Sequence, residues 1–428
     1  MLDNIVIKGG QFLKGDVVIP PSKSLSHRAI IAAGLAEGTC KVDNIIQSQD
    51  IIATTRCMSQ LGATYEKLED SLIVKGIHYP IMVNGKVFDC HESGSTLRFM
   101  IPIGMLGNDK ISFTGQGKLT TRPLDPFLNI FKEQQIPYSH NGELPLEVEG
   151  SIKPGQFEIP GDISSQFITG LMYTLPLLDG DSEIIITSNL ESKGYLDLTM
   201  DVLKSFGIQI INEDYKRFVI RGNQTFKAID YRVEGDFSQV AFWIVAGLIN
   251  GDLSCLDMNP NSSQGDKEVI EIVGRMLGSI EVKSDRILVK KSKTQATIID
   301  GSQCPDIIPV LTVLAAVTPG ETQIINAKRL RIKECDRLNA IATEMNALGA
   351  DITELEDGLI IKGVSKLRGG KVKGWNDHRI VMSLAVASLV CEEEVYIEGC
   401  HAINKSYPHF FEQFKQVGGL FDEWHMEK

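Results

Sequence analysis

The sequence predicts an α/β protein built from six copies of one unit, arranged as two lobes of three units each. Three observations support this prediction. An apolar helical stretch followed by a glycine or acidic turn and a strand-like run occurs six times. An amphipathic helix follows in each unit, and most of these helices end near a glycine. These glycines recur regularly, because Gly207, Gly278 and Gly349 are 71 residues apart and Gly418 follows 69 residues later, a period longer than that of common solenoids.

The two kinds of helix are expected in different places. The first kind is apolar on nearly all sides, so we expect it in the interior of the lobes, over residues 29–36, 97–106, 167–178, 240–249, 307–317 and 380–390. The amphipathic helices are expected over residues 51–61, 126–133, 196–206, 267–277, 336–348 and 407–417. Most of them lead into a β-hairpin pattern, as at 214–220 and 357–361.

The sixth unit lacks its final strand at the C-terminus, and residues 4–10 at the N-terminus resemble the missing strand. We therefore expect the first residues of the chain to complete the last unit. The first lobe is predicted to comprise residues 14–234, and the second lobe residues 1–13 together with 235–428. The chain then crosses twice between the lobes, which predicts a hinge.

Composition excludes several classes of protein. A chain of 428 residues exceeds a single hydrophobic core, and 43% hydrophobic with 23% charged residues is typical of a globular protein. The net charge of −12 argues against nucleic acid as the main partner. We find no apolar run that approaches the roughly 18 residues of a membrane span and no secretory pattern, so we expect a cytoplasmic protein. Eight scattered cysteines without zinc-ligand spacing indicate free thiols.

A polar cluster stands at the start of each apolar helix. In residues 22–28, three serines accompany Lys23 and Arg28 where a helix begins, and free backbone N–H groups and the helix dipole there favour an anion. The other clusters occupy residues 92–98, 161–166, 235–239, 305–306 and 376–379. Each cluster alone is equally consistent with an ordinary capped helix. Because equivalent helix ends share one side of a lobe, we predict a cleft between the lobes for a substrate with several negative charges.

No nucleotide-binding motif accompanies these clusters. The glycine-rich loop at 115–123 is neither a Walker A motif nor a dinucleotide fingerprint, so ATP and NAD are not indicated.

Over essentially its whole length, the sequence resembles the 5-enolpyruvylshikimate-3-phosphate (EPSP) synthase family. The resemblance rests on the order and spacing of residues 22–28 (SKSLSHR), 93–98, 121–123 (TRP), 164–167 (SSQF), 333–338 (KECDRL), 376–379 (NDHR) and 405–408 (KSYP). It implies the two-lobed enolpyruvyl transferase fold, with three βαβαββ units in each lobe and the active site in the cleft. It also implies transfer of the enolpyruvyl group of phosphoenolpyruvate to the 5-hydroxyl of shikimate 3-phosphate, by addition and elimination, with no metal or organic cofactor.

The resemblance also assigns residues to the site. As catalytic groups it implies Asp306 as base, Glu334 as proton donor and acceptor, and Lys23 as a stabilising charge, although the order of the proton transfers stays open. The residues implied for phosphoenolpyruvate are Lys23, Gly94, Arg122, Arg337, Arg379 and Lys405. Those implied for shikimate 3-phosphate are Lys23, Ser24, Arg28, Ser164, Ser165, Gln166, Ser192, Tyr195, Asp306 and Lys333.

Three positions depart from the family pattern, and two alternatives remain. Glu92 stands where many relatives have Asn, Phe99 follows Arg98 where proline is frequent, and Arg329 stands where some members bind substrate through Asn.

One alternative is the sister enzyme that uses a UDP-amino sugar, but its loop cysteine is missing from residues 115–121. The other is a non-catalytic anion-binding scaffold, against which every expected acidic and basic position is filled. We expect a monomer whose partners are the two small substrates, with no nucleic acid and no membrane.

Overall fold

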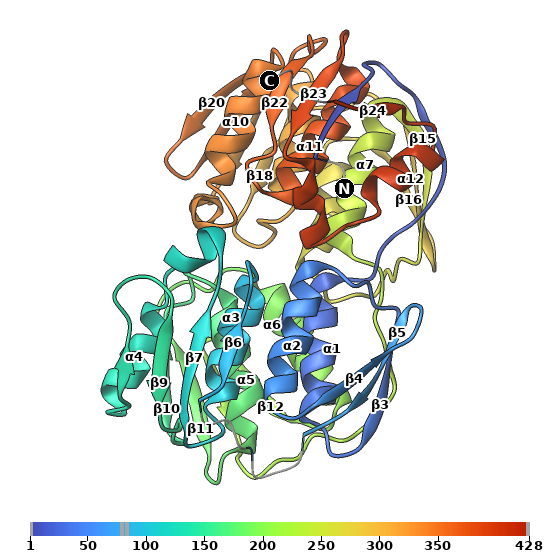
Figure 1. Ribbon diagram of the computed structural model, residues 1–428. Helices are drawn as coiled ribbons and strands as arrows, with labels where there is room; N and C mark the ends of the chain where they lie inside the picture. The colour runs from blue at the N-terminus through green and yellow to red at the C-terminus, as the bar shows by residue number, and fades with distance from the viewer. Residues whose placement is uncertain (1–2, 78–80, 82–84, 425–428) are drawn as a thin grey trace. The chain divides into compact units, whose positions relative to one another are not determined.

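The computed structural model describes residues 3–77, 81 and 85–424. The chain forms two compact lobes (Figure 1), the first spanning Lys23–Val233 and the second combining Met1–Ser22 with Glu234–Lys428. In the described part of the chain, each lobe contains three subdomains, each built on a four-stranded sheet. The predicted lobe ranges also include residues 1–2, 78–80, 82–84 and 425–428, which lie outside the described residues.

The first lobe holds three subdomains of similar composition. The first contains β14 (Tyr231–Arg232), α1 (Lys23–Leu35), β3 (Thr39–Asp43), α2 (Gln49–Gln60), β4 (Thr64–Lys67) and β5 (Ser71–Lys75). The second contains β6 (Val87–Asp89), α3 (Gly94–Gly104), β7 (Lys110–Thr114), α4 (Asp125–Glu133), β8 (Tyr138–Ser139) and β9 (Leu146–Glu149). The third contains β10 (Gln156–Ile159), α5 (Ser165–Thr174), β11 (Ser182–Ile186), α6 (Lys193–Ser205), β12 (Ile210–Glu213) and β13 (Arg217–Ile220).

The second lobe repeats this plan. Its first subdomain contains β2 (Leu13–Val18), α7 (Phe237–Asn250), β15 (Gly251–Leu256), α8 (Glu268–Arg275), β16 (Ser279–Val282) and β17 (Arg286–Lys290). The next contains β18 (Ile298–Asp300), α9 (Ile308–Ala316), β19 (Glu321–Ile325), α10 (Arg337–Ala347), β20 (Asp351–Leu355) and β21 (Gly358–Lys362). The last contains β22 (Gly370–Lys373), α11 (His378–Ala387), β23 (Val395–Glu398), α12 (Phe410–Gln416), β24 (Phe421–Glu423) and β1 (Asn4–Ile7).

One pairing pattern recurs in these sheets. The third sheet of the first lobe shows it: β10 lies parallel to β11, and β11 and β12 both pair antiparallel with β13. A parallel pair needs a crossover connection, which α5 supplies, whereas the antiparallel pair needs only a short hairpin. The predicted repeat of six α/β units is therefore confirmed.

The N-terminal strand completes the last subdomain, as predicted. β1 lies between β23 and β24 and is antiparallel to both. Its Ile5 and Ile7 side chains are fully buried. β1 thus takes the place that β21 has in the preceding subdomain.

The predicted lobe boundary requires a correction at residues 14–22 and Glu234, which belong to the second lobe. The cause is an exchange of strands. β2 precedes α1 in the chain but pairs in parallel with β15, from Leu13 opposite Gly251 to Val18 opposite Leu256. Conversely, β14 precedes α7 but pairs with β3 of the first lobe. The chain therefore passes between the lobes after these strands and not before them.

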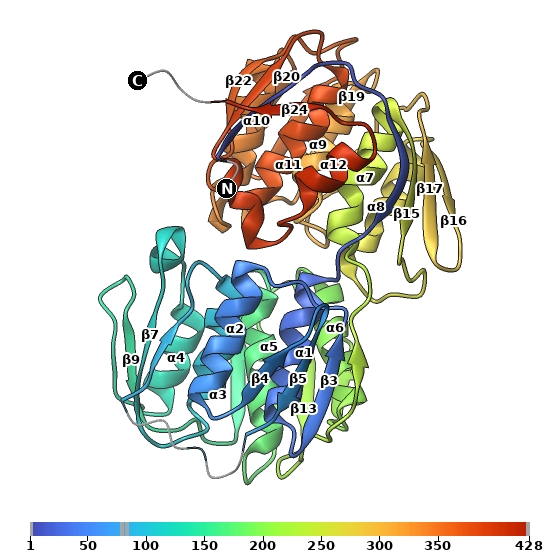
Figure 2. The same cartoon turned by 45° about the vertical axis from the view of Figure 1, so that its right-hand side comes forward.

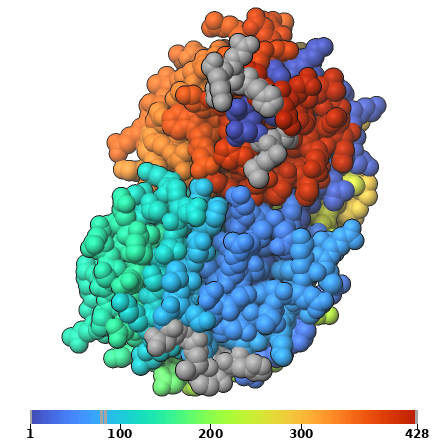
Figure 3. Space-filling model, viewed as in Figure 1, coloured from blue at the N-terminus to red at the C-terminus, as the bar shows by residue number. Residues whose placement is uncertain are grey.

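The apolar helices form the interior of each lobe, as predicted. In the first lobe, α1, α3 and α5 are buried along nearly their whole length, and the sheets lie outside them (Figure 1). In the second lobe, α7, α9 and α11 have the same position (Figure 2). On the face seen in Figure 3, most of the visible surface of the first lobe is coloured blue to cyan-green and comes from its first two subdomains.

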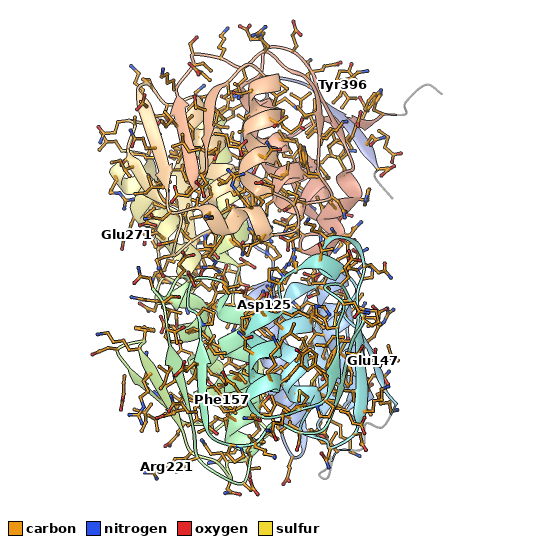
Figure 4. The ribbon with its side chains drawn as sticks, turned by 90° about the vertical axis from the view of Figure 1, so that its left-hand side faces the viewer. Asp125, Glu147, Phe157, Arg221, Glu271 and Tyr396 are labelled. Carbon is orange, nitrogen blue, oxygen red and sulfur yellow. The ribbon has the colours of Figure 1, made fainter. Side chains whose placement is uncertain are left out.

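The strands alternate between buried and exposed residues, as expected for a sheet with one face on a core. Phe157 of β10 is 1% exposed, whereas its neighbours Gln156 and Glu158 are exposed. Glu147 of β9 lies at the outer surface (Figure 4), where its carboxylate is 3.1 Å from Lys110 Nζ. The sheets thus shield the helices from solvent.

The eight cysteines are buried, and none of them forms a disulfide in the structure. Among the residues that the structure describes, no three His, Cys, Asp or Glu side chains are grouped to hold a metal ion. No helix in residues 3–77, 81 and 85–424 is both long and apolar enough to cross a membrane.

Candidate active site

A cluster of charged side chains in the second lobe surrounds the carboxylate of Asp306, just before α9. Its oxygen Oδ1 lies 2.9 Å from Arg337 Nη1 and 3.5 Å from Lys333 Nζ. Oδ2 accepts a hydrogen bond of 2.9 Å from Arg379 Nη2, and Arg379 Nη1 donates to the backbone carbonyl of Asp306 at 3.0 Å. The Asp306 side chain is 18% exposed, so three cations converge on a carboxylate that solvent still reaches.

Arg337 is the centre of this cluster. Its side chain is 1% exposed and contacts three carboxylates. Besides Asp306, Nη2 donates to Glu334 Oε2 at 2.7 Å and Nε donates to Asp377 Oδ2 at 2.7 Å. Glu334 lies three residues before Arg337, in the bend that precedes α10, and this bend turns its carboxylate toward the guanidinium. The guanidinium is thereby held in one orientation.

The proximity of these charges shifts their pKa values. Burial by itself would raise the pKa of Asp306, but Arg379, Lys333 and Arg337 hold it well below its ordinary value. Burial lowers the pKa of Lys333 to about 8, against the opposing attraction of Asp306. The pKa of Arg337 is raised, because Asp377, Glu334 and Asp306 outweigh its burial. At neutral pH Asp306 is therefore a carboxylate, and Lys333 and Arg337 beside it are cations.

The start of α11 supplies the remaining members of this cluster. Asp377 is the N-cap residue of α11, and its Oδ1 accepts the backbone N–H of Arg379 at 2.8 Å. The preceding Asn376 accepts a hydrogen bond of 2.7 Å from Lys405 Nζ through its backbone carbonyl. The two-residue step from Asn376 to Asp377 thus joins Lys405 to the arginine cluster.

In the first lobe, a second group of polar side chains lies at the starts of α3 and α5. Gln166 accepts a hydrogen bond of 2.9 Å from Arg98 Nη1 and donates one of 2.9 Å to Ser95 Oγ. A Cβ atom added to Gly94 would lie 2.5 Å from Arg122 Nη1. Gly94 therefore has no space for a side chain, because the Arg122 guanidinium lies directly against its backbone.

The starts of α1 and α6 form a third group. The guanidinium of Arg28 donates to the backbone carbonyls of Ser24 at 2.7 Å and Tyr195 at 3.0 Å, and to Thr199 Oγ1 at 2.9 Å. It also lies over the Phe99 ring, 5.3 Å from the centroid. Arg28 is 2% exposed, so in this structure it fixes the positions of Ser24 and Tyr195.

Lys23 and the predicted serines occupy helix starts in the same lobe. Lys23 Nζ lies 2.9 Å from Asp50 Oδ2 at the start of α2. Ser164 is the N-cap residue of α5, where its hydroxyl accepts the Gln166 N–H at 3.3 Å, and Ser165 is buried beside it. Ser192 precedes α6 in a left-handed conformation with φ of 57° and is fully buried.

The structure therefore brings the predicted residues together in groups within each lobe. Asp306, Lys333, Glu334, Arg337 and Arg379 form one cluster in the second lobe, which Lys405 joins through Asn376. The first lobe holds the other ten predicted residues: Lys23, Ser24, Arg28, Gly94, Arg122, Ser164, Ser165, Gln166, Ser192 and Tyr195.

Two acidic residues of these groups had no predicted part. Asp377 is fully buried against Arg337, and Asp50 is paired with Lys23. The position of Asp377 directly before a helix indicated an N-cap residue, but no local signal pointed to Arg337, which is 40 residues away. Asp50 had no such signal, because 27 residues separate it from Lys23.

The structure shows the surroundings of the three residues that depart from the family pattern. A Cβ atom on Gly117 would lie 2.8 Å from Glu92 Oε2, so the Glu92 carboxylate lies against the glycine-rich loop. Phe99 does not disturb the start of α3, which begins normally at Gly94 with Ser93 as its cap. Arg329 is 8% exposed, and its charge contributes to the lowered pKa of Lys333.

Comparison with known sequences identifies related proteins along the whole chain. The family model for EPSP synthase (3-phosphoshikimate 1-carboxyvinyltransferase) matches residues 7–414. A protein of Clostridium novyi is 55% identical over the full length of both chains. One of Clostridium acetobutylicum is 54% identical over 96% of this chain and 97% of its own. Both relatives are named 3-phosphoshikimate 1-carboxyvinyltransferase.

Solved structures share the fold. The EPSP synthase of Acinetobacter baumannii superposes with a TM-score of 0.83 over 99% of each chain, at 23% sequence identity. The enolpyruvyl transferase NikO of Streptomyces tendae superposes with a TM-score of 0.78 over 99% of each chain, at 16% identity. The predicted two-lobed enolpyruvyl transferase fold is thus confirmed.

Proposed function

The chain belongs to the EPSP synthase family, and we propose that it transfers the enolpyruvyl group of phosphoenolpyruvate to the 5-hydroxyl of shikimate 3-phosphate, releasing phosphate. The observation that carries this proposal is the cluster around Asp306. It holds two carboxylates for proton transfer, Asp306 and Glu334, beside cations for an anionic substrate. The alternative acceptor, a UDP-amino sugar, is not supported by the named relatives of this chain.

Phosphoenolpyruvate is bound through its carboxylate and phosphate. We assign this role to Arg337, Arg379 and Lys405 in the second lobe and to Lys23, Arg122 and Gly94 in the first. Arginine suits planar bidentate contacts with carboxylate and phosphate oxygens, and the lysines add point charges. The absence of a side chain at Gly94 lets the Arg122 guanidinium lie directly against its backbone, which supports the assignment of both residues to one binding site.

Shikimate 3-phosphate is bound mainly by the first lobe. Hydroxyls and backbone N–H groups at helix starts suit its phosphate. The residues assigned to it there are Lys23, Ser24, Arg28, Ser164, Ser165, Gln166, Ser192 and Tyr195. From the second lobe, Asp306 and Lys333 are assigned to the hydroxyls of the ring. Arg28 contributes mainly by positioning Ser24 and Tyr195, since it is bonded to both backbone carbonyls.

The chemistry is an addition followed by an elimination. The 5-hydroxyl oxygen attacks C2 of phosphoenolpyruvate while its proton passes to Asp306, and Glu334, which enters this step as the carboxylic acid, delivers its proton to C3. The resulting tetrahedral intermediate carries a methyl group. Glu334 then removes a proton from this methyl group, the bond between C2 and the phosphate oxygen breaks, and the enolpyruvyl double bond re-forms. The departing phosphate takes up the proton held by Asp306, which restores the base, and Lys23 stabilises the negative charge of the phosphate.

Substrate binding also tunes the base. Arg337 and Arg379 both contact Asp306 in the structure and keep its pKa low, so it is a weak base in this state. When phosphoenolpyruvate draws these guanidiniums onto its own anionic groups, Asp306 loses part of that stabilisation. Its basicity rises as the hydroxyl arrives.

The two lobes act together in this proposal. The assigned residues divide between them, so we propose that the substrates bring the lobes together at a cleft, with the two chain crossings near residues 22 and 234 as hinge. The enzyme is expected to work as a cytoplasmic monomer without a metal or organic cofactor. Its partners are the two small substrates.

The direct test is phosphate release from phosphoenolpyruvate, measured with shikimate 3-phosphate and with UDP-N-acetylglucosamine in parallel reactions. Release with shikimate 3-phosphate alone is the expected result. Release with the amino sugar alone would keep the reaction class but contradict the acceptor. No release with either would indicate an anion-binding scaffold instead of an enzyme.

A further inference from the structure

A cavity of about 550 Å³ lies in the second lobe and shares no residue with the cluster around Asp306. It lies where the parallel strands β22 and β23 end, beside the start of β1, in the sheet that includes β22 and β24 (Figure 2). The carboxyl ends of parallel strands are a frequent location of ligand sites. Its lining includes Lys373, Trp375 and Glu398, none of which has a part in the proposed reaction.

Trp375 forms an aromatic wall of this cavity and is held firmly in place. Its indole N–H donates a hydrogen bond of 2.6 Å to Glu344 Oε1, and Glu344 is 6% exposed. The other oxygen of Glu344 accepts the backbone N–H of Lys373 at 3.0 Å. Trp375 is nevertheless 37% exposed, and its φ of 52° is rare for a bulky residue. The backbone thus presents part of an aromatic surface to solvent in a fixed orientation.

The lining of the cavity carries charges of both signs. Asp3 and Glu398 are acidic, and Lys373 is basic. His401 Nδ1 lies 2.7 Å from Asp3 Oδ1, which sets the orientation of the imidazole ring. A lining with two carboxylates disfavours a polyanion such as a phosphorylated substrate. It suits a small molecule with one positive and one negative group, since carboxylate and ammonium side chains each bind the opposite charge.

We propose that this cavity binds an α-amino acid in its zwitterionic form, with an aromatic side chain. Glu398 receives the ammonium group, Lys373 binds the carboxylate, and the side chain packs on Trp375. The volume lies within the range of small-molecule sites. This ligand satisfies all three features of the cavity together, whereas an amine or a carboxylic acid alone satisfies two.

The cavity is connected to the proposed phosphoenolpyruvate site, and this second part of the proposal rests on the proposed function. Trp375 is followed by Asn376, which also has a positive φ, of 50°, and whose carbonyl accepts Lys405 Nζ. The next residue, Asp377, holds Arg337. A ligand packed on Trp375 thus acts on the turn that positions two substrate cations, and we expect it to change the KM for phosphoenolpyruvate.

Calorimetric titration of the full chain with L-phenylalanine, L-tyrosine and L-tryptophan, without substrates, tests the site. We expect saturable binding with one ligand per chain. Phenethylamine lacks the carboxylate, and 3-phenylpropionate lacks the ammonium group. Each should bind at least about tenfold more weakly than L-phenylalanine, because each loses one charge-assisted contact.

Two variants identify the location, and a third is their control. Glu398→Gln and Lys373→Met should each weaken amino acid binding about tenfold. Lys371→Met is the matched control: Lys371 lies two residues away on the same strand, exposed and over the Trp424 ring at 5.1 Å, outside the cavity lining. This variant should bind as the unmodified chain does. Circular dichroism establishes that each variant is folded.

The outcomes separate the proposals. If none of the three amino acids binds, the site is overturned. It is also overturned if Glu398→Gln and Lys373→Met bind the amino acid as tightly as the unmodified chain does. The KM for phosphoenolpyruvate is then measured with and without L-phenylalanine. A KM that stays the same despite binding would overturn the connection through Asn376. Because the titration needs no turnover, an inactive protein that binds the amino acid would contradict the proposed function and leave the site supported.

Discussion

Asp306 shows how groups of opposite charge are paired within one site. Lys333, Arg337 and Arg379 face the carboxyl groups of Asp306, Glu334 and Asp377, three basic side chains against three acidic ones. A buried charge without a partner would be costly, whereas these groups compensate one another. An anionic substrate competes with the carboxylates for the arginines, and this competition couples its binding to the basicity of Asp306.

The role of Glu334 in proton transfer is tested by Glu334→Gln. Glutamine keeps an oxygen that can accept from Arg337 but has no ionisable proton, so we expect substrate binding to persist while kcat falls by about 10²–10⁴. Calorimetry measures the binding, and phosphate release measures the turnover. Glu354→Gln is the control, since Glu354 pairs with Arg331 and Asn339 outside the cluster and should keep normal turnover. Unchanged kcat in Glu334→Gln would contradict the assignment.

The lowered pKa of Lys333 predicts a dependence on pH. Below about pH 8 its ammonium is charged and attracts shikimate 3-phosphate, and above this value it becomes neutral. We therefore expect kcat/KM for shikimate 3-phosphate to fall as the pH rises through about 8, because this ratio reports the ionisation of the free enzyme. In Lys333→Arg the side chain stays charged, so the falling limb should move to higher pH. An identical limb in both proteins would assign it to another group.

The helix ends show how a repeated element tolerates different residues. Gly62, Gly207, Gly349 and Gly418 follow amphipathic helices with positive φ values. After α4, which lacks the glycine, Gln135 adopts the left-handed conformation with φ of 55°. After α8, Leu277 adopts it with φ of 59° while Gly278 does not, so the glycine there stands one residue late. Of the six amphipathic helices, only α4 and α8 are therefore followed by a residue other than glycine in the left-handed conformation, which is unfavourable for a residue with a side chain.

Replacement of Leu277 tests this account of the helix ends. Leu277 is 64% exposed, so Leu277→Gly removes little packing and relieves the left-handed conformation. We expect the free energy of unfolding to rise by about 0.5–1 kcal/mol, after the greater entropy of glycine in the unfolded chain is subtracted. Gly62→Ala is the opposite control, since Gly62 has φ of 104° and should lose about 1 kcal/mol. Denaturant unfolding measures both. Destabilisation by Leu277→Gly would show that its side-chain contacts dominate.

At the scale of the whole molecule, the chain is interlaced between its two lobes. β2 and β14 each pair in the lobe opposite to the helix that follows them, and β1 is held between β23 and β24. Each lobe is thus closed by strands distant in sequence. The two crossings, after Ser22 and after Val233, are the places where motion between the lobes is expected.

Closure of the lobes on the substrate is tested by small-angle X-ray scattering. We expect the radius of gyration to decrease when shikimate 3-phosphate is added, because both lobes contribute residues to its proposed site. Inorganic sulfate at the same concentration is the control: it is too small to contact both lobes, so it should leave the radius unchanged. An unchanged radius with shikimate 3-phosphate would count against closure.

Much of the candidate site was predictable because its residues stand in short motifs at helix starts. The segment 333–338 already held Glu334 and Arg337 three residues apart, and their contact is local in sequence, although Glu334 lies in the bend before α10 and not in the helix. The partners that determine their ionisation were not predictable. Asp306 and Asp377 are 31 and 40 residues from Arg337 in sequence, and only the packing of α9, α10 and α11 brings their carboxylates to its guanidinium.

The sequence by itself determined the repeat, the interior helices and the strand that completes the last subdomain, because periodicity and local motifs are properties of neighbouring residues. The tertiary structure alone decided which strand belongs to which lobe. Both β2 and β14 precede an apolar helix, as first strands do elsewhere in the chain, so no local signal distinguishes them. Their exchange depends on hydrogen bonds to β15 and β3, distant segments whose free backbone groups each strand satisfies.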